Sequence, residues 1–194
     1  MTPIDFYFDF RSLYSYLAHS QLGSLGAAVN YRPMDVVAVM KQVGNTPTTI
    51  TCPAKGKYAG TDLQRWAKRY GLTLSRHKDM KSIDGRKLLR AVLAAEECGL
   101  AKEAVAAIFP AFWGYSLPLS TTEDLARVLG NAGIGEAKIA SGVDSSELDH
   151  RLTQRSNEAA GRGVFGAPTF IVNDEMFFGN DRLEFIREKQ RMTA

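Results

Sequence analysis

Cysteine, histidine and long apolar runs are scarce in this 194-residue chain, which has two cysteines and three histidines. Cys52 and Cys98 are too far apart for a Cys-x-x-Cys redox motif or a short metal-ligand pair. His19, His77 and His150 lack a ligand spacing such as His-Glu-x-x-His. We therefore expect two free thiols in a reducing compartment and no metal site.

No apolar run reaches the roughly 18 residues that a membrane-spanning helix needs. The N-terminal residues MTPIDFYFDF lack the basic and then apolar pattern of a secretory signal. The sequence thus predicts a cytoplasmic protein without membrane contact. A hydrophobic fraction of 45 % and a charged fraction of 23 % are typical of a globular chain and exclude a coiled coil or a disordered protein.

Excess charge is also small, since 24 basic and 21 acidic residues leave a net charge of +3. This balance argues against a nucleic-acid partner. Residues 55–90 nevertheless contain only three acids and eleven basic residues: Lys55, Lys57, Arg65, Lys68, Arg69, Arg76, Lys78, Lys81, Arg86, Lys87 and Arg90. This segment is either a solvated helical face or a surface that attracts an anionic ligand.

Alternating apolar residues over 4–10 predict a strand, and residues 29–33 predict a second one. Ser12 precedes a helical pattern over 13–25 and is a suitable N-cap, while Gly26 is a suitable stop. This order is a β-α-β unit with a parallel strand pair. A short helix is expected at 35–43.

The middle of the chain is predicted to be irregular over 44–57, where Gly, Pro and Thr are frequent, and mostly helical over 58–156. A Gly/Pro turn that leads into a strand is expected within 164–172, and a second strand over 176–178, before a last helix through Leu183. The fold class is therefore α/β: a thioredoxin-like βαβ…ββα fold with a large all-helical insertion. Its thioredoxin-like domain comprises 1–43 and 157–194, and 44–156 form a loop and an inserted helical domain.

Four segments, in order, resemble a known family: FYFDFRSLYSYLA (6–18), the stretch from Gly44 to Ala67, GVFGAPTF (163–170) and MFFGNDRL (176–183). They resemble kappa-class glutathione transferases and, more closely, bacterial 2-hydroxychromene-2-carboxylate isomerases of the DsbA-like thioredoxin superfamily. The resemblance runs nearly end to end. It implies kappa-class architecture and a cytoplasmic homodimer with glutathione as cofactor.

The activity that the resemblance implies is glutathione-dependent interconversion of 2-hydroxychromene-2-carboxylate and trans-o-hydroxybenzylidenepyruvate, in aromatic hydrocarbon catabolism. Two alternatives stay open. One is a kappa-class-like transferase or peroxidase that acts on other electrophiles, and the other is a non-catalytic glutathione-binding module. The partner that all three share is a small molecule.

Ser12 is the expected catalytic residue. Redox members of the superfamily have Cys-x-x-Cys where this chain has Ser12-Leu13-Tyr14-Ser15, and a serine cannot exchange disulfides. From the pattern alone Ser12 is a helix cap. The resemblance implies that it also stabilises the glutathione thiolate by a hydrogen bond at the positive end of the helix.

The same resemblance implies that glutathione is bound by Ser12, Lys55, Ala167, Phe178, Gly179, Asn180 and Asp181. It implies substrate contacts from Asn45, Lys41 and Lys55. Ala167-Pro168 is expected to be a cis peptide that exposes the Ala167 backbone, although an ordinary trans turn is the alternative. Asp181 is alternatively a first-turn acid of the last helix, and Lys41 a solvated lysine.

Two departures from the family pattern concern the site. Leu13 replaces a proline after the serine, and Phe177-Phe178 stands where related isomerases have tryptophans. A further expectation concerns six large side chains of the insertion, which belong to the core, cover the pocket over Ser12 or form the two-fold contact: Phe109, Phe112, Trp113, Tyr115, Leu117 and Leu119.

Overall fold

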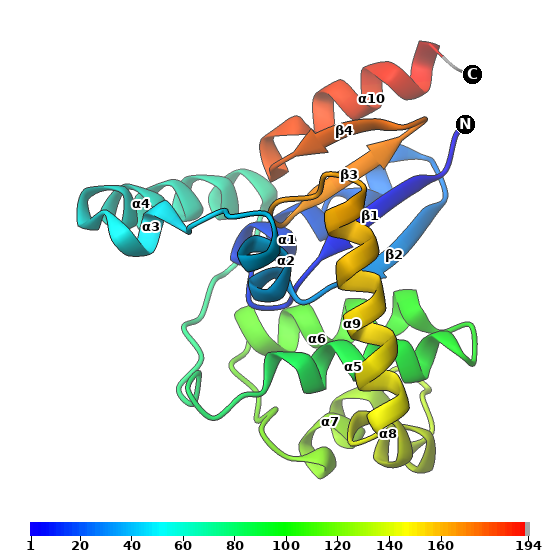
Figure 1. Ribbon diagram of the computed structural model, residues 1–194. Helices are drawn as coiled ribbons and strands as arrows, with labels where there is room; N and C mark the ends of the chain where they lie inside the picture. The colour runs from blue at the N-terminus through cyan, green and yellow to red at the C-terminus, as the bar shows by residue number, and fades with distance from the viewer. Residues whose placement is uncertain (193–194) are drawn as a thin grey trace.

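A mixed four-stranded sheet forms the centre of the computed structural model, which describes residues 1–192 (Figure 1). The strands are β1 (Ile4–Phe8), β2 (Val29–Pro33), β3 (Thr169–Val172) and β4 (Glu175–Phe178), in the order β2-β1-β3-β4. β1 is parallel to β2 and antiparallel to β3, and β4 is antiparallel to β3.

The alternation in β1 places its side chains on two different faces, as the sequence predicts. Phe6 and Phe8 are buried against the larger core, and Tyr7 belongs to a smaller cluster on the opposite face. Phe6 stacks on Phe170 of β3, with ring centroids 5.2 Å apart. The strand ends at Phe8 rather than at Phe10, because the chain turns at 9–12 to begin the first helix.

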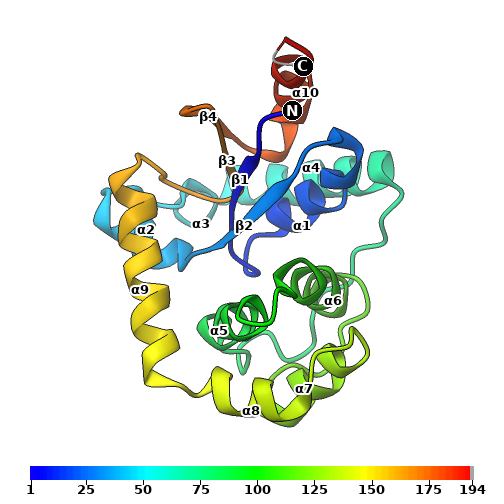
Figure 2. The same ribbon diagram turned by 90° about the vertical axis from the view of Figure 1, so that its right-hand side faces the viewer.

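Helices cover both faces of the sheet (Figure 2). α2 (Val36–Gln42) and α9 (Ser146–Gly161) lie on one side, and α1 (Leu13–His19) and α10 (Leu183–Met192) lie on the other. α5 (Gly85–Glu96), α6 (Ala101–Trp113), α7 (Thr122–Gly130) and α8 (Glu136–Val143) form a separate helical layer at one end of the sheet.

α1 is shorter than the sequence predicts. It ends at His19, and a 3-10 helix follows over Leu22–Leu25. The Ser20 hydroxyl donates to the Leu17 carbonyl at 2.7 Å, and the Gln21 N–H donates to the Ala18 carbonyl at 3.0 Å. These local bonds tighten the last turn and end the α-helical pattern. Gly26 then stops the segment in a left-handed conformation, as expected.

The prediction of irregular structure over 44–57 is wrong for most of that range. It contains α3 (Thr48–Thr51) and the beginning of α4 (Pro53–Tyr70). Pro53 occupies the first turn of α4, where its fixed φ favours a helix and its missing N–H costs no bond. α3 and the N-terminal half of α4 project away from the sheet (Figure 1).

The inserted helices build most of the larger core. Of the six side chains singled out above, Tyr115 and Leu117 are exposed and the other four are buried. Trp113 also donates its indole N–H to the Phe10 carbonyl at 2.7 Å, which ties the insertion to the turn after β1. A capping box formed by Thr121 and Asp124 begins α7. The predicted boundary between 156 and 157 falls inside α9.

The element order confirms the predicted α/β fold: a β-α-β unit, a helical insertion and a β-β-α unit. Cys52 and Cys98 are both free, as predicted. Within residues 1–192, no helix is long and apolar enough to cross a membrane.

Candidate active site

Ser12 lies between β1 and α1 and caps that helix. Its Oγ accepts the Ser15 N–H at 3.2 Å and donates to the Ala167 carbonyl at 2.9 Å. The Ala167-Pro168 peptide is cis, as the sequence predicts. The positive end of α1 therefore lies beside the backbone of Ala167, across 155 positions of the sequence.

A cavity of about 480 Å³ opens next to this contact. Its lining includes five residues assigned to glutathione from the sequence: Ala167, Phe178, Gly179, Asn180 and Asp181. They lie close together because a tight turn joins β3 to β4, so that the residues just before β3 lie beside the residues just after β4. Proteins bind small ligands in concave sites of this size.

Besides Pro168, five further residues line this cavity that the sequence did not assign to it: Tyr14, Tyr58, Asp62, Trp66 and Arg182. Tyr14 donates its hydroxyl to the Asp62 carboxylate at 2.9 Å, which joins α1 to α4. Burial, and then the hydrogen bond to this carboxylate, raises the pKa of Tyr14 above its usual value. All five lie within or beside the resembling segments, but a linear motif does not show which of its side chains meet in space.

Asn180 begins a 3-10 helix (Asn180–Arg182) at the edge of the cavity. Its side chain is 3 % exposed, and its Nδ2 atom is buried without a hydrogen-bond partner. An unsatisfied buried amide is costly, and such groups usually await a ligand or water. Beside it, Asp181 forms an ion pair with Arg182 at 2.6 Å. The cavity thus offers an amide donor, a carboxylate and a guanidinium within three consecutive residues.

The three residues assigned to the substrate lie outside the lining of this cavity. Asn45 donates its side-chain amide to the Phe165 carbonyl at 2.7 Å, which holds the loop before Ala167. Lys41 is exposed on the last turn of α2, and Lys55 is exposed on the first turn of α4. The Phe165 and Phe178 rings, 4.5 Å apart, lie between this loop and the cavity.

The basic segment has a partly structural role. Arg86 pairs with Asp35 and Asp149, Lys87 with Asp144, and Arg90 with Asp84 and Asp149. These ion pairs join α5 to α9 and to the turn before α2. The interpretation of 55–90 as one anion-attracting surface is therefore wrong for these three residues.

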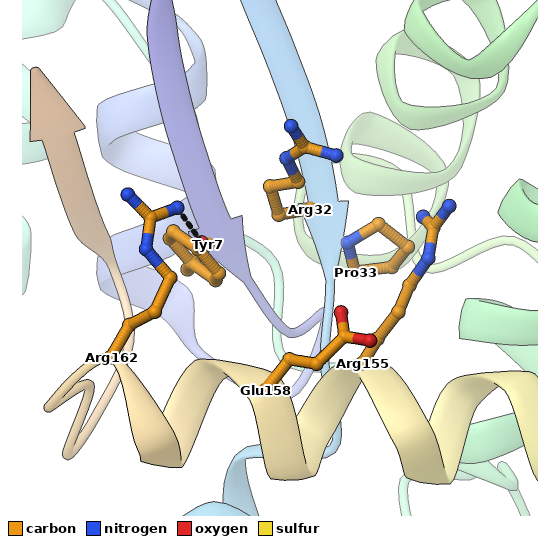
Figure 3. Close-up of a pocket in the computed structure, with 6 residues that line it drawn as sticks. All are labelled: Tyr7, Arg32, Pro33, Arg155, Glu158 and Arg162. Carbon is orange, nitrogen blue, oxygen red and sulfur yellow. Dashed lines mark hydrogen bonds between the residues drawn. The ribbon is translucent and has the colours of Figure 1, made fainter.

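A second cavity, of about 190 Å³, lies between β1, β2 and α9, on the face of the sheet away from α1 (Figure 3). Tyr7, Arg32, Pro33, Arg155, Glu158 and Arg162 line it. Its arginines already have acidic partners: Asp5 for Arg32 and Arg162, and Glu96 for Arg155. We therefore take the larger cavity beside Ser12 as the candidate site.

Metal ions are bound in proteins by groups of His, Cys, Asp or Glu side chains. No group of three or more His, Cys, Asp or Glu side chains within residues 1–192 is arranged to hold an ion.

Comparison with known proteins identifies the class. Residues 3–190 match the DSBA-like thioredoxin domain. The chain is 32 % identical over 188 residues to 2-hydroxychromene-2-carboxylate isomerase of Sphingobium xenophagum, which covers 94 % of this chain and 95 % of the relative. A solved structure of such an isomerase superposes with a TM-score of 0.88 at 31 % identity, covering 98 % of this chain and 95 % of the other.

Glutathione S-transferase kappa 1 of Caenorhabditis elegans is 29 % identical, with 95 % of this chain and 89 % of the relative covered. The fold is thus that of a DSBA-like thioredoxin domain. The chain belongs to that family and, within it, to the 2-hydroxychromene-2-carboxylate isomerases, and it is an enzyme of the isomerase class.

Proposed function

We propose that the chain is a glutathione-dependent isomerase that interconverts 2-hydroxychromene-2-carboxylate and trans-o-hydroxybenzylidenepyruvate. The observation that carries the proposal is the Ser12 hydroxyl, which caps α1 and donates to the carbonyl of Ala167, a residue that lines the cavity. The relatives' names support the substrate, and the kappa-class relatives' names support glutathione.

The residues that line the cavity fit glutathione. Asn180 has a buried amide that lacks a partner, and Asp181 offers a carboxylate to an ammonium group. Ala167 offers backbone groups to a peptide main chain. Phe178 and Gly179 complete the same wall of the cavity. Lys55, which is exposed on α4, would contact a carboxylate of glutathione. Glutathione would supply a thiol whose anion adds reversibly to a conjugated double bond, so that the bond can rotate.

The task of the chain's own residues is to stabilise the anionic sulfur. A thiol with a pKa of about 8.5 is only a few per cent ionised near neutrality. The N–H groups of the first turn of α1 and the Ser12 hydroxyl favour the anion. Ser12 donates to the Ala167 carbonyl in the structure, so we infer that a cysteinyl N–H on that carbonyl frees the hydroxyl for sulfur. Lys41 on α2, Lys55 on α4 and Asn45 in the loop between α2 and α3 remain the residues that we propose for the substrate carboxylate.

An ultraviolet assay of chromene ring opening, with and without added glutathione, tests this proposal. We expect turnover only when glutathione is present. Equal turnover without glutathione would contradict the cofactor assignment. No turnover under either condition would contradict the substrate assignment.

The similarity to kappa-class transferases favours a second candidate, conjugation of glutathione to other electrophiles. Turnover of 1-chloro-2,4-dinitrobenzene without chromene isomerisation would support it. Binding of glutathione without turnover of either compound would instead support the non-catalytic module. We further propose a cytoplasmic homodimer in which each site is built within one chain.

A further inference from the structure

The turn that presents Ser12 is fixed from several directions. The Ser12 N–H donates to the Asp9 carbonyl at 3.0 Å, and the Trp113 indole N–H donates to the Phe10 carbonyl at 2.7 Å. The Asp9 carboxylate, which is fully buried, accepts the Arg11 N–H at 2.9 Å and the Val36 N–H at 3.0 Å. The turn therefore depends on a buried negative charge, which requires a counter-ion.

Arg11 is that counter-ion. Its Nη2 atom lies 2.5 Å from Asp9 Oδ2 and 2.6 Å from Asp35 Oδ1, so that one guanidinium joins two carboxylates. Asp35 also caps α2 and accepts Arg86 Nη1 of α5 at 2.9 Å. A continuous chain of charge-assisted hydrogen bonds thus runs from the helical insertion to the residue before Ser12.

Gly85 shows how closely α5 fits this chain. A Cβ atom at Gly85 would lie 2.6 Å from Arg11 Cδ and 2.7 Å from Arg11 Nε. Real side chains do not approach so closely, and Arg11 has little freedom to move because both of its carboxylate partners hold it. The first residue of α5 therefore sets the position of the Arg11 side chain.

We propose that Arg11 is a positioning residue: held between Asp9 and Asp35, it fixes the 9–12 turn and thereby aims the Ser12 hydroxyl at the ligand's sulfur. The part that concerns sulfur rests on the proposed function, whereas the part that concerns the turn does not. The two parts are tested separately.

The first experiment uses the ligand-free protein and measures amide hydrogen exchange over residues 9–20. In Arg11→Gln we expect exchange about tenfold faster there than in the wild type, because the turn and the cap at Ser15 open more often. Arg11→Lys keeps a positive charge but lacks the planar guanidinium that can bond both carboxylates, and we expect an intermediate exchange rate.

Arg162→Gln is the matched control. Arg162 also joins a β1 carboxylate, Asp5, to a second element, but near the start of β1 and not at the turn that follows the strand. We expect it to leave exchange over 9–20 unchanged. Equal rates in Arg11→Gln and the wild type would overturn the inference, as would equal acceleration in Arg162→Gln.

The second experiment measures the thiolate absorbance of bound glutathione near 240 nm against pH, together with kcat. We expect Arg11→Gln to raise the thiol pKa by about one unit and to lower kcat about tenfold. The Kd of glutathione should change less than about threefold, since its other contacts remain. Gly85→Ala, which displaces Arg11 without removing its charge, should act in the same direction.

A wild-type thiol pKa and kcat in Arg11→Gln would show that the residue is only structural. The proposed function fails differently. In that case the wild type itself leaves the thiol pKa of glutathione at its free value or binds no glutathione, while the exchange experiment still decides whether Arg11 fixes the turn.

Discussion

At the scale of single residues, Ser12 combines a structural role with the chemical role that we propose for it. It caps α1 and contacts Ala167 at the same time, so the two interpretations of this serine are compatible. A helix cap is exposed at the positive end of the helix, where an anion is most stable. The position that suits capping is therefore also the position that suits chemistry.

We predict that Ser12→Ala lowers kcat by about one to two orders of magnitude. A hydrogen bond to a charged group contributes about 1.5–3 kcal/mol, and each 1.4 kcal/mol changes the rate about tenfold. Ser145→Ala is the matched control, because Ser145 caps α9 through the Leu148 N–H at 3.3 Å, away from the cavity. Urea unfolding should show a lower free energy of unfolding in both variants, because each loses a helix cap. Steady-state kinetics should show a lower kcat only in Ser12→Ala. Normal turnover of Ser12→Ala would remove Ser12 from the mechanism.

His19 is the residue that we expect to make stability depend on pH. Burial, and then the Lys102 charge, lowers its pKa from 6.5 to about 4. The unfolded chain binds the proton more tightly, so stability is complete above about pH 6.5 and is lost as the pH falls toward 4. At about 1.4 kcal/mol per unit, the loss is of order 3 kcal/mol.

Urea midpoints measured between pH 4 and pH 8 test this dependence. We expect His19→Gln to flatten the decline below pH 6.5, and the exposed His150→Gln variant to retain it. The same slope in His19→Gln and the wild type would show that other groups cause the decline.

At the scale of elements, the sequence predicted those strands and helices whose characteristic residues are close together in the chain. The alternation over Ile4–Phe8 and the N-cap at Ser12 are examples. The continuous segment from Ala167 to Asp181 was also sufficient to indicate one wall of the cavity. The opposite wall depends on α4, whose Pro53 begins a helix in a stretch that composition alone suggests is irregular.

Long-range polar contacts were the part that the sequence could not provide. Tyr14 meets Asp62 across 48 positions, and Arg11 meets Asp35 across 24. Charged and hydroxyl side chains have many compatible partners in any sequence, and only the packed fold selects one. The basic residues Arg86 and Arg90 illustrate the same difficulty, because both pair with Asp149 in α9, about 60 positions along the chain.

We predict that Tyr14→Phe loosens α4. Ala67 is the one residue that α4 buries among those with described burial, so the hydrogen bond to Asp62 is one of its few attachments to the body. Amide exchange over residues 55–66 should become several-fold faster, in keeping with the loss of about 1 kcal/mol. Tyr58→Phe, which changes an exposed tyrosine of the same cavity, is the control. Unchanged exchange in Tyr14→Phe would show that packing alone holds α4.

At the scale of the whole molecule, two layers share one core, and parts of the surface remain apolar. Tyr115 and Leu117 are 73 % and 41 % exposed and line an open groove of about 270 Å³ between α6 and α7. Tyr58, on the projecting part of α4, is 62 % exposed. Exposed apolar groups of this kind often take part in contacts between copies of a chain.

The last prediction is therefore that the protein is a homodimer whose two sites act independently. Closed two-fold dimers are the commonest homo-oligomers, and five of the residues assigned to glutathione line one cavity within the chain. Light scattering at micromolar concentration should give twice the 21.3 kDa of one chain, and a value near the chain mass would reject the dimer. Dimers that combine one wild-type and one Ser12→Ala chain, isolated with two different affinity tags, should retain half of the wild-type kcat per dimer. Much lower activity would contradict independent sites, because the substitution in one chain would then impair the intact site of its neighbour.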